Sequence, residues 1–322
     1  CAALIVAVAS KTKRGIILQS ILVTGGAGFI GSHTVDALLA KGFRVRVFDN
    51  LSSGKLSNLP QHAALEFVEG DIRDAQAVSS AMANMGAVLH LAAQVSVQSS
   101  IEQPVASSEL NVRGFLNVLD AARQAGIKRV VYASSAAVYG LPSELPLREV
   151  ALTRPMSPYG LEKLINDQYA ALYDELYGMT CLGMRYFNVY GPRQDPKSPY
   201  AGVISKFNDA ARADQPLKVF GDGLQTRDFV YVGDVAQSNV AALNSDLQGV
   251  CNIGTGRSVT LLQMIDALRE VVGGRLPVEH MPERSGDIRD SCAVVEKMNQ
   301  SLHVTAQVPL VEGLRSLWLQ GA

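Results

Sequence analysis

Residues 20–31 read SILVTGGAGFIG, and this stretch decides the fold. The first five residues form a short apolar run, and the glycines that follow have the spacing G-x-x-G-x-x-G. Glycines at a strand-to-helix turn let the main chain approach a pyrophosphate, and the N-terminus of the helix stabilises its charge. The stretch therefore predicts a Rossmann-type dinucleotide site, with a glycine-rich turn that holds no ligand as the alternative. Its predicted contacts are Gly25, Gly28, Phe29, Ile30 and Gly31.

An acidic residue ends the second predicted strand. Asp49 follows Gly31 by 18 residues, where a carboxylate accepts hydrogen bonds from the adenosine ribose and repels a 2′-phosphate. This favours NAD over NADP, and a simple turn aspartate is the alternative. His90, inside the fourth strand, is interpreted as a core residue rather than a ligand. Asp71 and Ile72, after the third strand, are predicted to flank the adenine, with a simple turn aspartate as the alternative. Further predicted cofactor contacts follow the second and fourth strands: Asn50, Leu91, Ala92 and Ala93.

Short apolar runs alternate with helical patterns, which indicates a doubly wound parallel sheet with crossover helices. Prolines become frequent after residue 191 and mark a change of domain. We predict an α/β fold with a Rossmann domain over residues 21–190 and a return segment at about 228–250. A smaller C-terminal α/β substrate-binding domain would comprise residues 191–227 and 251–322. The predicted long helices are 107–124 and 159–177.

Composition limits the possible partners. The chain has 322 residues, of which 48% are hydrophobic and 18% charged, and a net charge of −1. This gives no electrostatic reason to expect nucleic acid or a membrane as a partner. Four widely separated cysteines show no metal-ligand spacing, so we expect reduced thiols, no metal and a cytoplasmic protein. Residues 1–20 are interpreted as an extension of uncertain origin.

A phenol and an ammonium lie four residues apart at Tyr159 and Lys163. Ser157 and Pro158 suit the cap and first position of a helix, so both side chains should project from one face. A lysine there favours the phenolate, which would let Tyr159 act as a base near neutral pH. Ser135 ends the fifth strand, where a doubly wound sheet binds its ligands. The predicted catalytic residues are therefore Ser135, Tyr159 and Lys163.

With these motifs in place, residues 21–318 resemble the extended short-chain dehydrogenase/reductase family, and most closely its nucleotide-sugar 4-epimerases. The resemblance rests also on LAA at 91–93, SSAAVYG at 134–140, RYFNVYG at 185–191, RDFV at 227–230 and RSGD at 284–287. It implies tightly bound NAD and a reversible reaction. Tyr159 would take the proton of the sugar 4-hydroxyl while hydride leaves C4, and the 4-keto sugar would rotate before hydride returns. Ser135 would hold O4, and Lys163 would lower the pKa of Tyr159 and bond the nicotinamide ribose.

The resemblance also implies contacts to the substrate. Asn188, Arg227 and Arg284 would bind the diphosphate, and Asp287 would bind the uridine ribose. Without the family, each of these four reads equally well as a surface or salt-bridge residue. The remaining implied contacts are Tyr186 to the cofactor, and Ser96, Ser135, Tyr159, Arg193 and Ser291 to the substrate.

Two departures from related enzymes narrow the reaction. Nucleotide-sugar 4,6-dehydratases carry an Asp-Glu pair directly after the serine or threonine, where Ala136 and Ala137 stand here. Neither alanine can do acid–base work, so dehydration is disfavoured, and the missing Glu argues against a UDP-glucuronate decarboxylase. The resemblance implies that the position four residues after Asp287 gates the pocket for the sugar C2 substituent, where the small Ser291 would leave room for an N-acetyl group.

The favoured reaction is therefore interconversion of UDP-GlcNAc and UDP-GalNAc, with UDP-Glc/UDP-Gal as a second activity. Residues 191–196, GPRQDP, also resemble the N-acetyl-preferring branch. The alternatives are a shifted alignment that puts Ser291 elsewhere, a UDP-glucose 4-epimerase proper, and another enzyme on the same scaffold. A reductase that uses external NADPH should lack Asp49, and a non-catalytic NAD-binding protein should have lost Tyr159 or Lys163. The resemblance further implies a homodimer formed through the two long helices.

Overall fold

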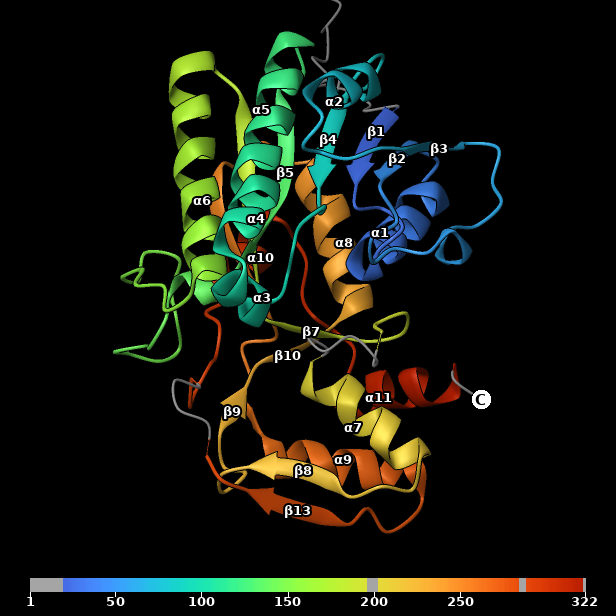
Figure 1. Ribbon diagram of the computed structural model, residues 1–322, viewed down its shortest axis with the longest axis vertical. Helices are drawn as coiled ribbons and strands as arrows, with labels where there is room; N and C mark the ends of the chain where they lie inside the picture. Colours follow the sequence, from blue (N-terminus) through green and yellow to red (C-terminus); the bar gives the residue numbers. More distant parts are fainter. Residues whose placement is uncertain (1–19, 196–201, 284–287, 321–322) are drawn as a thin grey trace, which may run out of the picture.

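The central sheet grows outward from β1 (Ser20–Thr24). Its other strands are β2 (Arg44–Asp49), β3 (Leu65–Glu69), β4 (Ala87–His90), β5 (Arg129–Ser135), β6 (Thr180–Tyr186) and β11 (Gly249–Ile253). The computed structural model describes residues 20–195, 202–283 and 288–320. Within these ranges the seven strands are parallel and follow the order β11-β6-β5-β4-β1-β2-β3. This order confirms the predicted doubly wound fold, and its direction changes between β1 and β4 (Figure 1).

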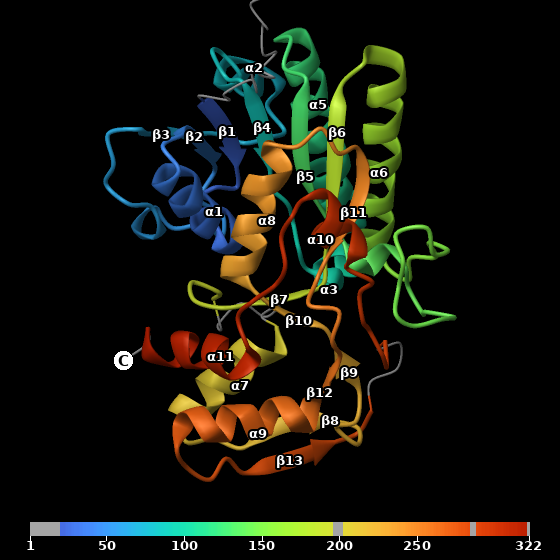
Figure 2. The same ribbon diagram turned by 180° about the vertical axis from the view of Figure 1, so that it is seen from behind.

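Helices cover both faces of the sheet because its strands send apolar side chains to each face in turn. Ile21 and Val23 belong to one core and Leu22 to the other. The first core is covered by α1 (Phe29–Ala40), α8 (Val232–Leu243) and α10 (Glu296–Ser301), as Figure 2 shows. The second is covered by α2 (Ala75–Ala81), α5 (Gly114–Gln124) and α6 (Pro158–Tyr177).

A smaller unit with its own hydrophobic core lies beyond the carboxyl ends of the large sheet (Figure 1). Its strands β8 (Leu217–Phe220) and β13 (Val278–Met281) pair in parallel, and β9 (Thr226–Arg227) pairs with β12 (Val259–Thr260). Its helices are α7 (Val203–Arg212), α9 (Leu261–Val272) and α11 (Leu310–Leu319). The pair β7 (Asn188–Tyr190) and β10 (Phe229–Tyr231) lies between the two units.

The segment that returns to the large sheet is longer than the predicted 228–250. The edge strand β11 ends at Ile253, and α10 also packs on the large core through the buried Met298. Gly191 directly follows β7, and a domain boundary at this residue stays a prediction. The chain therefore crosses between the two units several times, and these crossings bring distant segments to one edge.

The helix predicted at 107–124 is interrupted. After α3 (Val97–Glu102) and α4 (Pro104–Ser108), a π-helical turn η2 (Glu109–Arg113) precedes α5. A π turn inserts an extra residue and redirects the side chains it carries. Here it carries Asn111, whose amide accepts a 2.9 Å hydrogen bond from the Gln94 main-chain nitrogen and donates one of 2.9 Å to the Gln94 oxygen. The turn thereby fixes the loop that follows β4.

Two further findings concern the described ranges alone. None of their helices combines the length and apolar character needed to cross a membrane. No group of three or more His, Cys, Asp or Glu side chains in them is arranged to hold a metal ion. The predicted extension over residues 1–20 lies outside the described residues, apart from Ser20 at the start of β1.

Candidate functional site

The turn between β1 and α1 has no space for side chains. Gly25 has a positive φ of 70°, and a Cβ built there would lie 2.5 Å from the Ala92 main-chain nitrogen. A Cβ on Gly31 would lie 2.1 Å from the Gly25 oxygen. Helix α1 starts after Gly28, which gives it no side-chain cap. The first turn of α1 therefore presents main-chain amides to an anion, as a pyrophosphate site requires.

Asp49 supports this turn from the end of β2. Its buried carboxylate accepts hydrogen bonds of 3.0 Å from the Ala27 nitrogen and 2.9 Å from the Leu51 nitrogen, one on each oxygen. An ionised carboxylate offers about four acceptor positions, so capacity is left for ribose hydroxyls. The predicted ribose contact is therefore compatible with a second role, which is to hold the glycine turn in place.

The predicted adenine side is an exposed polar cluster. Asn50 Nδ2 donates a 2.9 Å hydrogen bond to Asp71, and Arg73 forms a 2.7 Å ion pair with the same carboxylate. The hydrogen bond from Arg73 holds the pKa of Asp71 well below its usual range. Ile72 is buried against Gly114. These contacts fix the loop after β3, and its contact with adenine stays a prediction.

The end of β4 meets the glycine turn directly. Leu91 donates a 3.0 Å main-chain hydrogen bond to Thr24, and the Ala92 nitrogen donates one of 3.3 Å to the Thr24 hydroxyl. His90 Nδ1 lies 2.7 Å from that hydroxyl. Burial, assisted by the nearby Lys163 charge, lowers the pKa of His90 to about 3. His90 is thus a neutral core residue, as predicted, and the small Ala92 and Ala93 line the approach to the turn.

The predicted catalytic residues converge beyond β5. Ser157 caps α6 by accepting a 3.1 Å hydrogen bond from Gly160, and Pro158 occupies the first turn, as predicted. Lys163 is buried, donates a 3.0 Å hydrogen bond to the Ala133 oxygen and lies 5.8 Å from the Tyr159 ring centroid. Ser135 begins the short helix η3 (Ala136–Val138) and hydrogen-bonds Tyr159. Geometry therefore brings all three side chains together.

The pKa of Tyr159 is governed mainly by burial. Burial raises the pKa of Tyr159, the Ser135 hydrogen bond opposes this rise, and the Glu162 carboxylate adds to it. Burial also lowers the pKa of Lys163 to about 8, against the raising effects of Asp167 and Glu162. Burial therefore has the largest effect on the Tyr159 pKa, and a lowering of this pKa by Lys163 stays a prediction.

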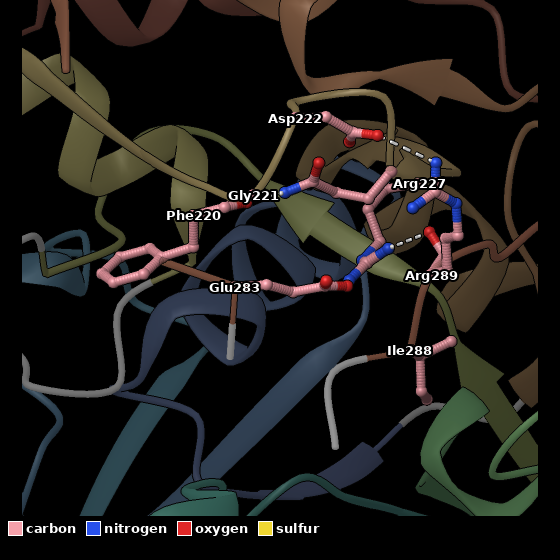
Figure 3. A pocket seen from close by; sticks show the side chains of 8 residues that line it. Phe220, Gly221, Asp222, Arg227, Glu283, Ile288 and Arg289 are labelled. Atoms are coloured by element: carbon pink, nitrogen blue, oxygen red, sulfur yellow. Dashed lines mark hydrogen bonds and ion pairs between the residues drawn. The ribbon is translucent and has the colours of Figure 1, made fainter. Parts of the chain in front are cut away.

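Two adjoining cavities open at the edge of the smaller unit, and Arg227 lines both. The larger, of about 230 Å³, also contains Asn188 from β7, which brings together two of the predicted diphosphate ligands. Arg227 donates hydrogen bonds of 2.8 and 3.0 Å to the main-chain oxygens of Thr226 and Arg289, and Arg289 pairs with Asp222 (Figure 3). Residues missed by sequence reasoning also line the cavities: Lys218, Phe220, Asp222, Gln225, Glu283 and Arg289.

A buried aspartate next to Arg227, also missed, organises this region. Asp228 accepts hydrogen bonds from the main-chain nitrogens of Thr255, Gly256 and Ala293, at 2.7 to 3.1 Å. Burial raises its pKa although these bonds oppose the rise. Segment 289–293 is thereby tied alongside β9, and it carries Ser291, which is buried. The predicted gate residue thus lies on a chain segment anchored beside Arg227.

Other predicted site residues have different surroundings. Arg193 forms a 2.8 Å ion pair with Asp36 on α1, and Ser96 is buried as the cap of α3. Tyr186 packs in the large core, and its hydroxyl donates a 2.7 Å hydrogen bond to Asn239. Their contacts with ligands stay predictions. Arg284 and Asp287 lie outside the described residues.

Comparison with known proteins agrees with this geometry. Residues 21–254 match the sequence profile described as the NAD dependent epimerase/dehydratase family. A putative UDP-glucose 4-epimerase of Methanocaldococcus jannaschii is 42% identical over 304 residues, covering 93% of this chain and 98% of the relative. A UDP-N-acetylglucosamine 4-epimerase of Methanobrevibacter ruminantium, solved with UDP-N-acetylmuramic acid, is 37% identical with a TM-score of 0.91, over 94% of this chain and 98% of its own. A Thermus thermophilus UDP-glucose 4-epimerase solved with NAD is 39% identical with a TM-score of 0.87, over 94% and 99%.

Proposed function

The chain belongs to the NAD dependent epimerase/dehydratase family as an NAD-dependent UDP-sugar 4-epimerase, and we propose that its preferred substrates are UDP-GlcNAc and UDP-GalNAc. The observation that carries the reaction type is the meeting of Ser135, Tyr159 and Lys163 beside two alanines. Ala136 and Ala137 follow Ser135 directly in η3 and bring no acid–base group to the sugar. We therefore infer that Tyr159 accepts the proton of the 4-hydroxyl, and that the two positions after Ser135 offer no acid–base side chain to expel water.

The chain's own residues suit NAD. Gly25 and Gly31 leave the main chain open where a Cβ would collide, and Asp49 keeps acceptor capacity for the ribose. NAD, when bound, accepts a hydride from the sugar C4 and returns it. Tyr159 takes and returns the proton of the 4-hydroxyl, and Ser135 orients that oxygen through its own hydroxyl. Because burial raises the Tyr159 pKa, the nearby Lys163 ammonium matters most when a proton leaves the phenol.

The cavity around Arg227 suits the nucleotide part of the substrate. Its guanidinium is held by two main-chain oxygens, and Lys218 adds a second cation to the lining. Cations and amides bind phosphate through charge-assisted hydrogen bonds. Phe220 offers an aromatic ring to a base. Arg284 and Asp287 are proposed to complete this contact.

The choice of sugar rests on Ser291. Substitution Ser291→Tyr is expected to lower kcat/KM for UDP-GlcNAc about tenfold more than for UDP-Glc, because its ring would fill the space proposed for the N-acetyl group. A tenfold difference corresponds to a steric cost of about 1.4 kcal/mol for the N-acetyl substrate. The ratio of kcat/KM for the two substrates is the measurement, which makes UDP-Glc the internal control. Equal losses on both sugars would contradict the gate.

The proposed reaction is tested by incubating the purified protein with UDP-GlcNAc, without added cofactor, and resolving the sugars. UDP-GalNAc should form. If no UDP-GalNAc formed but UDP-Glc were converted to UDP-Gal, the proposed N-acetyl substrate would be wrong and UDP-Glc would be the substrate. Appearance of a 4-keto-6-deoxy product would instead identify a dehydratase and refute the epimerase.

A homodimer is also proposed, and the exposed face of α6 supports it. Leu161, Leu172 and Leu176 on this helix are 49%, 48% and 65% exposed. Such an apolar face on a helix that lies beside α5 is suited to pairing with a second copy (Figure 1). The variant Leu172→Glu is expected to be a monomer by light scattering, and Leu319→Glu, on α11, is the control that should keep the native mass. A dimer that persists in Leu172→Glu would refute this interface.

A further inference from the structure

The side of α6 next to the catalytic pair carries a buried carboxylate. Glu162 lies between Tyr159 and Lys163 in sequence and is only 2% exposed. Its Oε2 accepts hydrogen bonds of 2.8 Å from the Ser107 hydroxyl and 2.7 Å from Asn111, and its Oε1 accepts one of 3.3 Å from Ser108. Carboxylates are rarely buried to this extent unless they are paired or hydrogen-bonded, and here three neutral donors hold the group.

The donors to Glu162 come from the interrupted helix. Asn111 lies in the π turn η2 and also bonds both main-chain groups of Gln94. The loop after β4, with its predicted cofactor contacts, is therefore tied through Asn111 to the helix of the catalytic residues. A second tie runs in parallel, since the Tyr159 nitrogen donates a 3.1 Å hydrogen bond to Ser100 on α3.

We propose that Glu162 is a positioning residue of the catalytic site, whose buried negative charge sets the field around Tyr159 and Lys163 and whose hydrogen bonds join α6 to the loop after β4. This inference rests on the proposed epimerase function. A negative charge disfavours a phenolate and favours an ammonium, so Glu162 holds the proton on both groups. The directions of the two pKa effects agree, since Glu162 raises the pKa of Tyr159 and of Lys163.

Other charged groups also face this region. Asp167 lies one helical turn beyond Lys163, and its charge is paired with Arg185 of β6 at 3.0 Å. His90 on β4 faces Lys163, and burial, helped by the Lys163 charge, lowers the His90 pKa. The elements packed against α6 carry further titratable groups: Tyr132 and Arg129 on β5, Cys181 and Tyr186 on β6, Cys251 on β11, Glu102 on α3, the Glu109–Arg113 pair on η2, and the Asp120–Arg123 pair on α5. The carboxylates of Asp167 and Glu109 pair with arginines. Glu162 differs from them because, in the described part of the chain, its hydrogen-bond donors are neutral side chains on α4 and η2.

The test compares Glu162→Gln with Glu175→Gln, which makes the same change of charge at an exposed position on the same helix. In the NAD-loaded protein, Glu162→Gln should move both limbs of the pH profile of kcat/KM to lower pH by about one unit, because it removes a negative charge near both groups. Glu175→Gln should leave both limbs in place. Loss of kcat with unmoved limbs would overturn the proposal and leave Glu162 a purely structural residue.

Two conservative variants keep the test decisive if Glu162→Gln does not fold. Glu162→Asp keeps the charge, so its limbs should stay near the native pH even if kcat falls. Ser107→Ala removes one donor and keeps the charge, so its limbs should stay or move to higher pH. A shift to lower pH in either variant would refute the electrostatic role.

A spectroscopic reading separates this inference from the proposed function. The Tyr159 pKa is obtained from the difference in phenolate absorbance between each protein and its Tyr159→Phe counterpart. It should fall in Glu162→Gln and stay unchanged in Glu175→Gln, whatever the enzyme catalyses. If no sugar is epimerised by the native protein, the proposed function fails and this titration still decides the role of Glu162.

Discussion

Tyr159→Phe is expected to lower kcat for epimerisation by about 10²–10⁴-fold, the usual contribution of a positioned acid–base group. The substitution removes only the hydroxyl that would take the proton of the sugar 4-hydroxyl. The ring keeps its place, because the main chain of residue 159 is bound to Ser100 and α6 is capped by Ser157. NAD content and thermal unfolding should therefore equal those of the native protein.

Two comparisons give this prediction its meaning. Tyr169→Phe makes the same chemical change at a 37% exposed position of the same helix and should retain full activity. Ser135→Ala should be milder than Tyr159→Phe, because Tyr159 remains to move the proton. If Tyr159→Phe kept more than a tenth of the native kcat, another group would be the base.

The positions of the proposed catalytic residues could be predicted because they depend on local rules. Ser157 and Pro158 are typical of the cap and first position of a helix, so they predict where α6 begins. A spacing of four residues then places Tyr159 and Lys163 on one face of this helix. The glycine spacing can be read locally, but its steric cause is only partly local: a Cβ on Gly31 would meet the Gly25 oxygen, whereas a Cβ on Gly25 would meet Ala92 from the end of β4. The doubly wound parallel sheet followed from the alternation of apolar runs and helices, whereas the order of its strands came from the structure.

The missed features depend on segments far apart in the chain. Asp228 anchors this region by accepting hydrogen bonds from the main-chain nitrogens of residues 255, 256 and 293. The sequence around residue 228 does not predict these distant partners. The π turn places Asn111 within hydrogen-bond distance of Gln94 and Glu162, which are far away in sequence. The apolar pattern of residues 107–124 predicts a continuous helix and gives no sign of this interruption. The raised pKa of Tyr159 reflects burial, and four-residue spacing says nothing about desolvation.

Gly31→Ala is expected to cause the second large loss, in the binding of NAD. A Cβ at this position would lie 2.1 Å from the Gly25 oxygen and 2.8 Å from the Gly26 Cα, so the turn must open. Overpacking of this kind costs about 1–3 kcal/mol of folding free energy. The same displacement moves the amides that would bind the pyrophosphate, and we expect NAD to bind roughly ten- to a hundredfold more weakly. Titration of the apoprotein with NAD measures the affinity.

The matched control is Gly274→Ala, since a Cβ there would meet no atom within 4 Å and the residue has no positive φ. It should leave NAD affinity unchanged and raise the free energy of unfolding by at most about 1 kcal/mol. Comparing the two alanines also separates steric conflict from the general effect of replacing a glycine, which by itself stabilises a chain by restricting its unfolded state. Because the collision in Gly31→Ala is with main-chain atoms, no rotation of a neighbouring side chain can relieve it. Native NAD affinity in Gly31→Ala would mean that the pyrophosphate does not bind at the start of α1, and that the glycine spacing serves helix packing alone.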